Sequence, residues 1–440
     1  MLFNIYNFNS PKLGHLPKEW KVVQLKEVAD FSRKPRDLVL KNFAKIPFIS
    51  MDLIPDDGTQ MPGYIFKPGN RISSGTYCEP GDILVAKITP CLENGKQCVV
   101  PNFKEGFAFA TTEVYALKPK HSIIDCYYLF AILRSPAIRK ELASKMEGST
   151  GRQRLPKHVL ENLEVPLPPL PEQRAIAYVL RTVQRAKEAT ERVIAALKGL
   201  KRSLMKHLFT YGPVPLDQAD QVPLKETEIG PVPEHWEVVR LGEIAKIERG
   251  KFAHRPRNDP RFYGGTIPFI QTGDVAKAGG RITSYSQTLN ELGLSVSRIF
   301  PKGTIVITIA ANIGYVGILE FDSAFPDSLI GITPASSVDN VFLAYYLQTQ
   351  QSKMDRLAPR GTQKNINIQF LKPWPIPKPP LVEQREIARI LQAVDRKIEA
   401  EENRKQALDV LFKTLLHNLM TAKIRVPRTM VERFASHEEE

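Results

Sequence analysis

Residues 166–180 read PLPPLPEQRAIAYVL, and residues 377–391 read PKPPLVEQREIARIL. Ten of these fifteen positions are identical, which chance does not explain. Proline is tolerated just before a helix but not inside one, and a glutamate in the first turn complements the helix dipole. Each stretch is therefore predicted to be a stiff, extended lead into a helix that begins near Glu172 or Glu383.

The similarity extends over most of the chain. Further pairs of similar segments follow in the same order, namely 16–29 with 232–245, 46–49 with 267–270, 80–85 with 301–306, 125–133 with 339–347, and 151–154 with 361–364. The offset of about 210 residues far exceeds the period of solenoid repeats, roughly 20–50 residues. A whole module is therefore duplicated in tandem, and the chain is predicted to fold as two like halves in a pseudo-two-fold arrangement.

The first part of each copy predicts a globule of strands and short helices. Short β-branched runs bounded by proline and glycine, such as 83–88 and 304–309, are typical of strands. The segments 125–133 and 339–347 predict short helices that pack on the sheet. The predicted fold class is α+β, with an α/β globule in each copy.

The second part of each copy predicts one long helix. Residues 172–211 contain no proline and only Gly199, and residues 383–423 contain neither proline nor glycine. About 40 helical residues span about 60 Å at 1.5 Å per residue. Apolar side chains recur close to every 3.5 residues, at Val179, Val183, Ala186, Val193, Leu197, Leu200 and Leu204 and at Ile387, Leu391, Val394, Ile398, Leu408, Leu415 and Leu419.

A long helix with one apolar stripe needs a partner, and the other copy supplies one. Under a two-fold-like rotation the two helices run antiparallel as a coiled coil, with the globules at opposite ends. Glu401 and Lys405 interrupt the second stripe. They are expected to be partly solvated, although they could instead set the register or face another subunit.

The composition favours a polyanionic partner. Lys and Arg outnumber Asp and Glu by 61 to 47, a formal charge of +14, and neutralising phosphates releases counterions. The cysteines show no metal-ligand spacing and are expected to be reduced thiols that serve as small apolar side chains, namely Cys78, Cys91, Cys98 and Cys126. Without an apolar run of 18 residues or a signal-peptide pattern, we expect a cytoplasmic protein that does not contact a membrane.

Catalytic motifs are missing from both copies. The sequence has no GxxxxGK[ST] phosphate loop, no [ND]PP[YF] tetrapeptide and no HExxH cluster. Pro55-Asp56-Asp57 and Pro326-Asp327 are only fragments of a nuclease-like metal site. Trp20 and Trp236 are expected to be core anchors rather than ligand-stacking residues. The framework residues repeat between the two copies, whereas the loops between them differ. This pattern is expected for two recognition modules with different targets.

The motif order, twice over, resembles the specificity (S) subunit of Type I restriction–modification enzymes. The resemblance covers the chain from about Leu16 to Lys423, and the PLPPLPEQR and PKPPLVEQR elements are its most specific part. It implies two target-recognition domains, each of which reads one half of a bipartite, asymmetric DNA site. The coiled coil would fix the distance between the halves, with several unread base pairs between them.

The resemblance also implies partners. These are double-stranded DNA, two modification subunits that bind S-adenosylmethionine and methylate adenine, and two restriction subunits that cleave DNA with ATP and magnesium. No cofactor, metal or catalytic residue is expected in this chain. The expected segments are a first recognition domain (1–165), a lead and central helix (166–228), a second recognition domain (229–376), a lead and distal helix (377–425) and a tail (426–440).

Loops dense in Lys, Arg, Gln and Asn are the candidates for DNA contact, because Arg and Lys pair with guanine and Asn and Gln with adenine in the major groove. In the first domain they are Arg33, Lys34, Arg36, Lys87, Arg152, Gln153 and Arg154. In the second they are Arg255, Arg257, Arg261, Arg360, Gln363, Lys364 and Asn365. The alternative for 151–154 and 361–364 is a solvated loop or a modification-subunit contact.

The repeated Glu-Gln-Arg triplets have two interpretations. As structure, they tie each globule to its helix; as function, they dock identical modification subunits, and they comprise Glu172, Gln173, Arg174, Glu383, Gln384 and Arg385. Three rival functions remain open at this level. They are a stand-alone two-site DNA-binding regulator, a chain that is itself an endonuclease or methyltransferase, and a coiled-coil scaffold without nucleic acid.

Overall fold

A computed structural model describes residues 16–149, 151–310, 312–359 and 364–436. The candidates Arg360 and Gln363 lie outside the described residues. The chain forms two compact units: unit 1 joins the described residues up to Val193 with those from Glu401 onward, and unit 2 comprises Ile194–Ala400. Each long helix is therefore shared between the two units, whereas the expected segments treat it as a separate body.

Unit 1 contains two four-stranded sheets. The first is β2 (Ala29–Phe31), β9 (Val114–Pro119), β6 (Ile83–Ala86) and β7 (Gln97–Val99), in spatial order. The second is β4 (Ile65–Lys67), β3 (Ile46–Ile49), β8 (Ala108–Ala110) and β5 (Thr76–Cys78). The helices of this globule are α1 (Leu25–Val28), α2 (Cys126–Arg134), α3 (Pro136–Ser144) and α4 (Lys157–Glu161), and helix α13 (Arg428–Ala435) follows near the end of the chain.

Unit 2 repeats this plan with one strand more. Its first sheet is β16 (Ala245–Arg249), β24 (Leu329–Pro334), β21 (Ile305–Thr308), β22 (Val316–Leu319) and β18 (Arg281–Ile282). Its second is β19 (Gln287–Leu289), β17 (Tyr263–Phe269), β23 (Ser323–Ala324) and β20 (Ile299–Phe300). The short helices are α6 (Leu241–Ile244), α7 (Thr272–Lys277), α8 (Glu291–Ser295), α9 (Asn340–Thr349), α10 (Gln351–Leu357) and α11 (Ile368–Leu371), and a small ribbon joins β13 (Leu224–Lys225) to β14 (Val232–Pro233).

The strand orders confirm the predicted duplication. The order β16-β24-β21-β22 in unit 2 repeats β2-β9-β6-β7 in unit 1, and β19-β17-β23-β20 repeats β4-β3-β8-β5. The predicted short helices are α2 and α9, and each begins after an aspartate cap, Asp125 or Asp339, whose carboxylate accepts two backbone N–H groups.

A two-stranded ribbon joins the start of each globule to its proline-rich end. Strand β1 (Lys21–Gln24) pairs antiparallel with β12 (Glu164–Leu167), and β15 (Glu237–Arg240) pairs in the same way with β25 (Pro375–Lys378). The prolines are tolerated because each strand of a two-stranded ribbon has a free edge. The two most similar parts of each copy therefore lie side by side.

The same junction contains an indole–carboxylate bond in each unit, buried in unit 1 and partly buried in unit 2. The indole N–H of Trp20 donates to Glu172 Oε2 at 3.0 Å, and that of Trp236 donates to Glu383 Oε2 at 2.9 Å. Both tryptophans are buried, which confirms their expected place in the core. In unit 1, Arg425 also binds Glu172 with two nitrogens, at 2.5 and 2.8 Å.

The glutamine of each Glu-Gln-Arg triplet ties the long helix to the short helix of its globule. Gln173 Oε1 accepts the backbone N–H of Asp125 at 2.9 Å, and its amide nitrogen donates to the carbonyls of Ile123 and Pro168. Gln384 repeats the first bond with Asp339 at 2.8 Å. Because both glutamines are almost fully buried, these bonds fix where each long helix begins.

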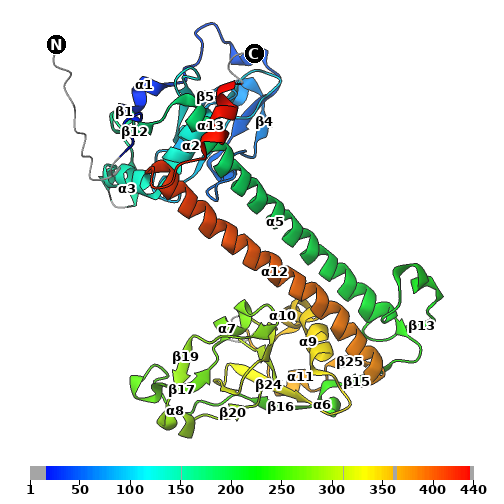
Figure 1. Cartoon of the computed structure of the whole chain (residues 1–440). Helices are drawn as coiled ribbons and strands as arrows, with labels where there is room; N and C mark the ends of the chain where they lie inside the picture. The colour runs from blue at the N-terminus through cyan, green and yellow to red at the C-terminus, as the bar shows by residue number, and fades with distance from the viewer. Residues whose placement is uncertain (1–15, 150, 311, 360–363, 437–440) are drawn as a thin grey trace, which may run out of the picture. The chain divides into compact units, whose positions relative to one another are not determined.

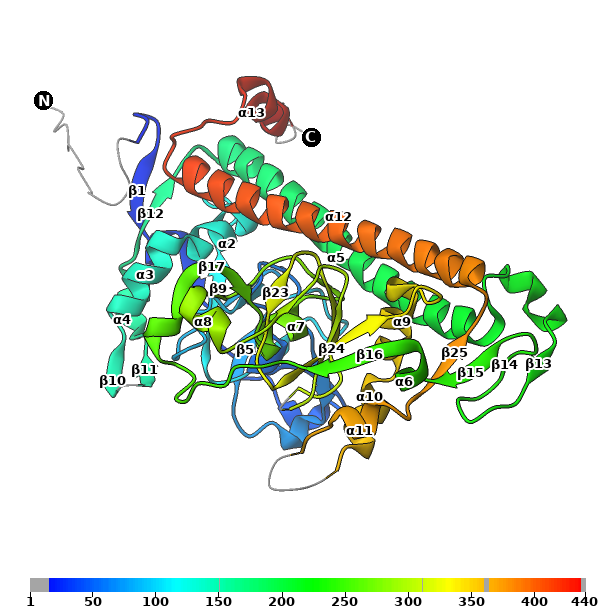
Figure 2. The ribbon, with the colours of Figure 1, turned by 90° about the horizontal axis from the view of Figure 1, so that it is seen from below.

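The predicted long helices are α5 (Leu170–Tyr211, 42 residues) and α12 (Leu381–Met420, 40 residues). Their ion pairs show that they run antiparallel, as Figures 1 and 2 also show. In unit 1, Lys187 pairs with Asp409 and Glu191 with Lys405, so the number rises by four on α5 as it falls by four on α12. In unit 2, Lys201 pairs with Asp395 in the same register.

The predicted apolar stripe is wrong at several positions. Val193 and Leu200 are 42% and 48% exposed, whereas Lys187 and Thr190 are buried. Polar groups can occupy such an interface when they are paired: Lys187 binds Asp409, and the Thr190 hydroxyl donates to a backbone carbonyl of its own helix. Paired polar residues as well as apolar residues therefore form the interface between α5 and α12.

The two residues that interrupt the second stripe differ in burial: Lys405 is partly solvated, as expected, and Glu401 is buried. Lys405 binds Glu191 at 2.9 Å, which supports the register-setting interpretation. Glu401 is only 6% exposed, so the expectation of a partly solvated position is wrong for it. A buried carboxylate on a long helix must be stabilised by polar neighbours, which apolar periodicity does not register.

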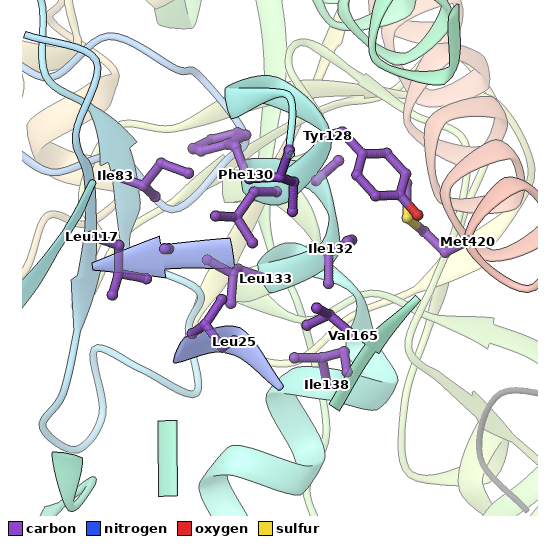
Figure 3. Close-up of a cluster of buried hydrophobic side chains, with 14 of the residues drawn as sticks. Leu25, Ile83, Leu117, Tyr128, Phe130, Ile132, Leu133, Ile138, Val165 and Met420 are labelled. Atoms are coloured by element: carbon purple, nitrogen blue, oxygen red, sulfur yellow. The ribbon is translucent and has the colours of Figure 1, made fainter. Parts of the chain in front are cut away.

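The core of unit 1 lies between its first sheet, α2 and α12 (Figure 3). Tyr128, Phe130, Ile132 and Leu133 on α2 are buried together with side chains of the sheet and of the helices. Met420 of α12 belongs to the same cluster, and the Tyr128 hydroxyl donates to the Pro166 carbonyl at 3.0 Å. The globule of unit 1 and the long helix α12 therefore share one core.

All four cysteines are free thiols, and three of them are buried. Burial raises the pKa of the Cys126 thiol to about 12, which keeps it protonated and unreactive. None of the helices in the described part of the chain combines the length and the apolar character needed to cross a bilayer.

Replacing Gln173 by alanine should lower the free energy of unfolding by about 2–4 kcal/mol, because one backbone N–H and two carbonyls lose their partner in a buried place. Thermal or urea unfolding measures the change. Gln406→Ala, at an exposed glutamine of α12, is the control and should change stability by less than about 0.5 kcal/mol. Equal effects of the two substitutions would contradict the role of Gln173.

Candidate nucleic-acid interface

In unit 1 the candidate basic residues gather beyond one edge of the first sheet, the edge at which strands β2 and β6 end. Strands β2 and β6 are both antiparallel to the β9 strand between them, so they run parallel to each other. The chain therefore leaves β2 towards Arg33 and leaves β6 towards Lys87 in the same direction. Arg33, Lys34 and Arg36 are exposed, and Lys87 is half-buried.

A short hairpin adds the remaining candidates of unit 1 to this edge. Strands β10 (Glu147–Ser149) and β11 (Arg152–Arg154) pair antiparallel, and Gly148 has a φ of +127° that disfavours any other residue. The hairpin is bonded to the end of β6, because the Thr89 N–H donates to the Gln153 carbonyl at 3.1 Å and the Leu155 N–H to the Lys87 carbonyl at 2.7 Å. Arg152 and Arg154 are exposed beside Lys87.

The charges at this edge are only partly balanced. Arg154 forms an ion pair with Glu113 at 2.6 Å, and the ammonium of Lys87 lies 4.8 Å from the centre of the Tyr115 ring. Burial and the nearby charge of Arg154 both lower the pKa of Lys87, as expected for cations gathered on one surface. Such a surplus of positive charge suits the phosphates of a nucleic acid.

Sequence reasoning missed one basic residue of this edge. Lys157, at the start of α4, lies over the Phe31 ring at 4.3 Å and binds Glu161 at 3.1 Å. Phe31 in turn contacts Tyr115 edge to face, which brings Lys157 towards Lys87. No repeated motif marks Lys157, so only the pairing of strands far apart in sequence reveals its place.

In unit 2 the corresponding edge has more internal pairing. Arg255 and Arg257 both bind the carboxylate of Asp327, and Arg261 binds Asp259 at 2.7 Å. The hydrogen bond from Arg261 lowers the pKa of Asp259. These arginines are exposed but already oriented, so a ligand would meet a fixed array of guanidinium groups rather than free side chains.

The remaining candidates of unit 2 follow the pattern of the first unit. Asn365 forms an isolated bridge with Ala310, just as Arg154 does with Ile88 in unit 1. Lys364 binds Asp355 at 3.0 Å. Arg249, which sequence reasoning missed, donates to the Asp327 carbonyl at 2.6 Å and so belongs to the same edge.

The acidic fragments noted in the sequence are engaged within the chain. Asp327 binds two arginines, and Asp57 accepts the Thr59 N–H at 2.8 Å. Among the residues that the structure describes, no cluster of three or more histidine, cysteine or acidic side chains could hold a metal ion.

The Glu-Gln-Arg triplets are mostly internal. Glu172, Gln173 and Gln384 are buried and bonded within their own unit, and Glu383 binds both Trp236 and His235. Arg174 is half-buried and Arg385 is exposed. These contacts support the structural interpretation of the triplets, and the docking interpretation stays a prediction.

Two like globules, each carrying its own set of basic loops and each built onto a pair of long antiparallel helices, define a two-site recognition protein. The chain belongs to the family of the Type I restriction modification DNA specificity domain, whose model matches residues 17–198 and 233–410. This match confirms the resemblance seen in the sequence and places one copy of the domain in each half.

Named relatives match either almost the whole chain or part of it. The putative Type I restriction enzyme MjaX specificity subunit of Methanocaldococcus jannaschii is 29% identical over 429 residues, which cover 96% of this chain and 97% of the relative. The EcoAI specificity subunit of Escherichia coli is 35% identical over 162 residues, 37% of this chain and 27% of the relative.

A solved structure supports the fold. The S subunit of a Type I restriction–modification system from M. genitalium matches with a TM-score of 0.56 and 16% identity, over 93% of this chain and 98% of that chain. A second match, with a TM-score of 0.58 and 22% identity, comes from work on complex assembly and conformational transition of the type I R-M system.

Replacing Arg152 and Arg154 by glutamine should weaken binding to duplex DNA that carries the site of the first domain. Each lost phosphate contact should also reduce the slope of log K against log salt by about 0.9. A salt-controlled titration measures both quantities. Lys118→Gln, at the other end of β9, is the control and should leave them unchanged. An unaltered affinity and slope in the arginine variant would remove the hairpin from the interface.

Proposed function

We propose that this chain is the sequence-recognition subunit of a Type I restriction–modification complex. Each recognition domain reads one half of a bipartite, asymmetric DNA site, and the long helices set the spacing between the halves. Modification subunits supply S-adenosylmethionine and adenine methylation, and restriction subunits supply ATP- and magnesium-dependent cleavage. The chain itself determines which DNA sequence is bound, and the other subunits carry out the reactions.

One observation carries the proposal: the two units share the same arrangement of strands and helices, but their basic loops differ. In both units the first strand of the first sheet, β2 or β16, leads into a basic loop. Unit 1 also carries an exposed hairpin, whereas unit 2 carries arginines held by Asp327 and Asp259. A duplicated enzyme would repeat its reactive groups, whereas two readers of different half-sites must differ in the loops that contact bases.

Continuous long helices suit the spacing role. Both α5 and α12 run without a break, and their ion pairs keep one register. A stiff spacer lets two modest half-site affinities combine through effective concentration, and the gain is lost when the site has the wrong length.

The helices also offer two equivalent docking surfaces. On α5 the stripe of Ala196, Gly199, Leu200 and Ser203 has the spacing of one helical face, and on α12 the stripe of Ala407, Val410, Leu411 and Thr414 occupies the same positions of the second copy. Leu200 and Leu411 are 48% and 44% exposed, and Val410 is 65% exposed. We propose that these stripes, rather than the buried triplets, bind two identical modification subunits.

Methylated adenines in host DNA, mapped with and without this chain, test the function directly. Loss of the chain should remove methylation from one split sequence and leave other modified sites unchanged. A chain purified alone should bind DNA but neither methylate nor cleave it. Methylation that persists without the chain, or a chain that binds DNA and never associates with a modification subunit, would favour the stand-alone regulator.

Leu200→Glu and Leu411→Glu should each weaken the binding of one modification subunit by about ten-fold or more, because an exposed apolar anchor is replaced by a charge. Native mass spectrometry of the complex then shows one modification subunit for each single variant and none for the double variant. Val382→Glu, at a 77% exposed valine outside both stripes, is the control and should leave two subunits bound. Full assembly of the double variant would refute this docking surface.

A further inference from the structure

In unit 2 one polar bridge connects the recognition globule to both long helices. Lys201 of α5 lies 2.7 Å from Asp395 Oδ1 of α12, and the hydroxyl of Tyr345 on α9 donates to Asp395 Oδ2 at 2.6 Å. Tyr345 is 6% exposed, and the Lys201 ammonium lies 5.0 Å from the centre of its ring. Burial and the bond to Asp395 raise the pKa of this hydroxyl, so it remains a donor.

Unit 1 contains a bridge of the same kind, built from other residues. Lys187 of α5 binds Asp409 of α12 at 2.9 Å, and it also donates to the backbone carbonyl of Asp57 at 2.9 Å. Asp57 belongs to the loop before β4, and the side chain of Lys187 is only 8% exposed. Here the lysine of α5 bonds both the aspartate of α12 and a group of the globule, whereas in unit 2 the aspartate of α12 bonds both of its partners.

The loop that reaches Lys187 passes close to α2 at a glycine. Gly58 has a φ of +103°, and a Cβ there would lie 2.9 Å from the guanidinium of Arg134. Unit 2 repeats this contact, because Gly280 has a φ of +116° and a Cβ there would lie 2.8 Å from Gln348. Arg134 and Gln348 are on α2 and α9, the short helices that pack against the long ones in each unit.

These bridges differ from a third ion pair between the helices, that of Glu191 and Lys405. Glu191 and Lys405 join α5 to α12 without a group from a globule. In the two bridges, by contrast, a neutral group of the globule, the Tyr345 hydroxyl or the Asp57 carbonyl, is also bonded to one member of the ion pair. Lys187 and Tyr345 are buried, so breaking their bonds would leave polar groups without partners away from water, and each bridge therefore resists tilting of its globule on the helices.

We infer that the two bridges, each built on a lysine of α5 and an aspartate of α12, are positioning elements that hold each recognition domain on the long helices and thereby set how strictly the gap between half-sites is measured. The inference rests on the proposed function and deepens it. Helix length sets the preferred gap, and the bridges set the tolerance around it. If a globule tilts freely, a site with one base pair more or less becomes reachable, and the penalty for the wrong gap falls.

Tyr345→Phe tests the bridge of unit 2, because it removes only the hydroxyl that binds Asp395. The assembled complex is assayed for methylation of duplexes whose gap is the preferred length or one base pair shorter or longer. Discrimination against the wrong gaps should fall about five- to ten-fold, the equivalent of one buried hydrogen bond. Methylation at the preferred gap should change less than this.

The neighbouring tyrosine provides a matched control. Tyr346 is also buried, and its hydroxyl donates to the Pro375 carbonyl within the globule at 3.2 Å, not to a long helix. Tyr346→Phe should lower stability by a similar amount and leave the gap profile unchanged. A purely structural role for Tyr345 would make the two variants behave alike.

The bridge of unit 1 gives a second, independent pair of variants. Asp409→Asn keeps the shape of the side chain but weakens the bond to Lys187, and it should broaden the gap profile. Glu191→Gln weakens the ion pair with Lys405, which joins the helices only, and should leave the profile narrow. This pair decides the question if Tyr345→Phe fails to fold.

The outcomes separate the inference from the proposed function. Parent complex that methylates no split site would refute the function itself. If the complex with the unchanged chain discriminates against wrong gaps, and the Tyr345→Phe and Asp409→Asn complexes discriminate equally well, the role of the bridges is refuted and the proposed function stands. Equal broadening in the test and control variants would also refute them.

Discussion

The bond between an indole and the first glutamate of a long helix, buried in unit 1 and partly buried in unit 2, is the interaction on which each unit depends. Trp20 with Glu172, and Trp236 with Glu383, join the opening strand of a globule to the helix that follows its closing strand. A carboxylate in this place must be bonded, because burial of an unpaired charge is very costly. The bond therefore fixes globule and helix as one body.

The rest of the architecture follows from that junction. The β1–β12 and β15–β25 ribbons bring the two ends of each globule together, and buried Gln173 and Gln384 attach the long helices to α2 and α9. Loops on the far strands are then free to vary, because none of these bonds involves them. Because these bonds hold the fold together at the junction with the long helix, the loops elsewhere in the unit can differ without loss of the fold.

The two units differ in how the arginines of their basic loops are held. Unit 1 presents Arg152 and Arg154 on a hairpin, with Glu113 as an acidic partner. Unit 2 holds Arg255 and Arg257 on the carboxylate of Asp327. A pre-oriented arginine loses less conformational freedom on binding than a free one, so the second edge is suited to fixed geometry and the first to adaptable contact with phosphates.

Several features could be predicted from the sequence because they are local or repeated. The duplication, the long helices, α2, α9 and the buried tryptophans were all accessible from motif order, proline placement and periodicity. Periodicity misplaced the stripe at Val193 and Leu200, because it counts apolar residues and ignores polar pairs such as Lys187 with Asp409. Lys157 escaped notice because its neighbours are far away in sequence.

The sequence by itself determined the number of copies, the type of each main element and the family to which the chain belongs. These properties rest on local preferences and on order along the chain, both of which a repeat makes visible. Only the tertiary structure decided which charges are balanced, which loops share an edge and how each globule is held to the helices. Those properties depend on pairs such as Lys201 with Asp395, whose partners meet only after the chain has folded.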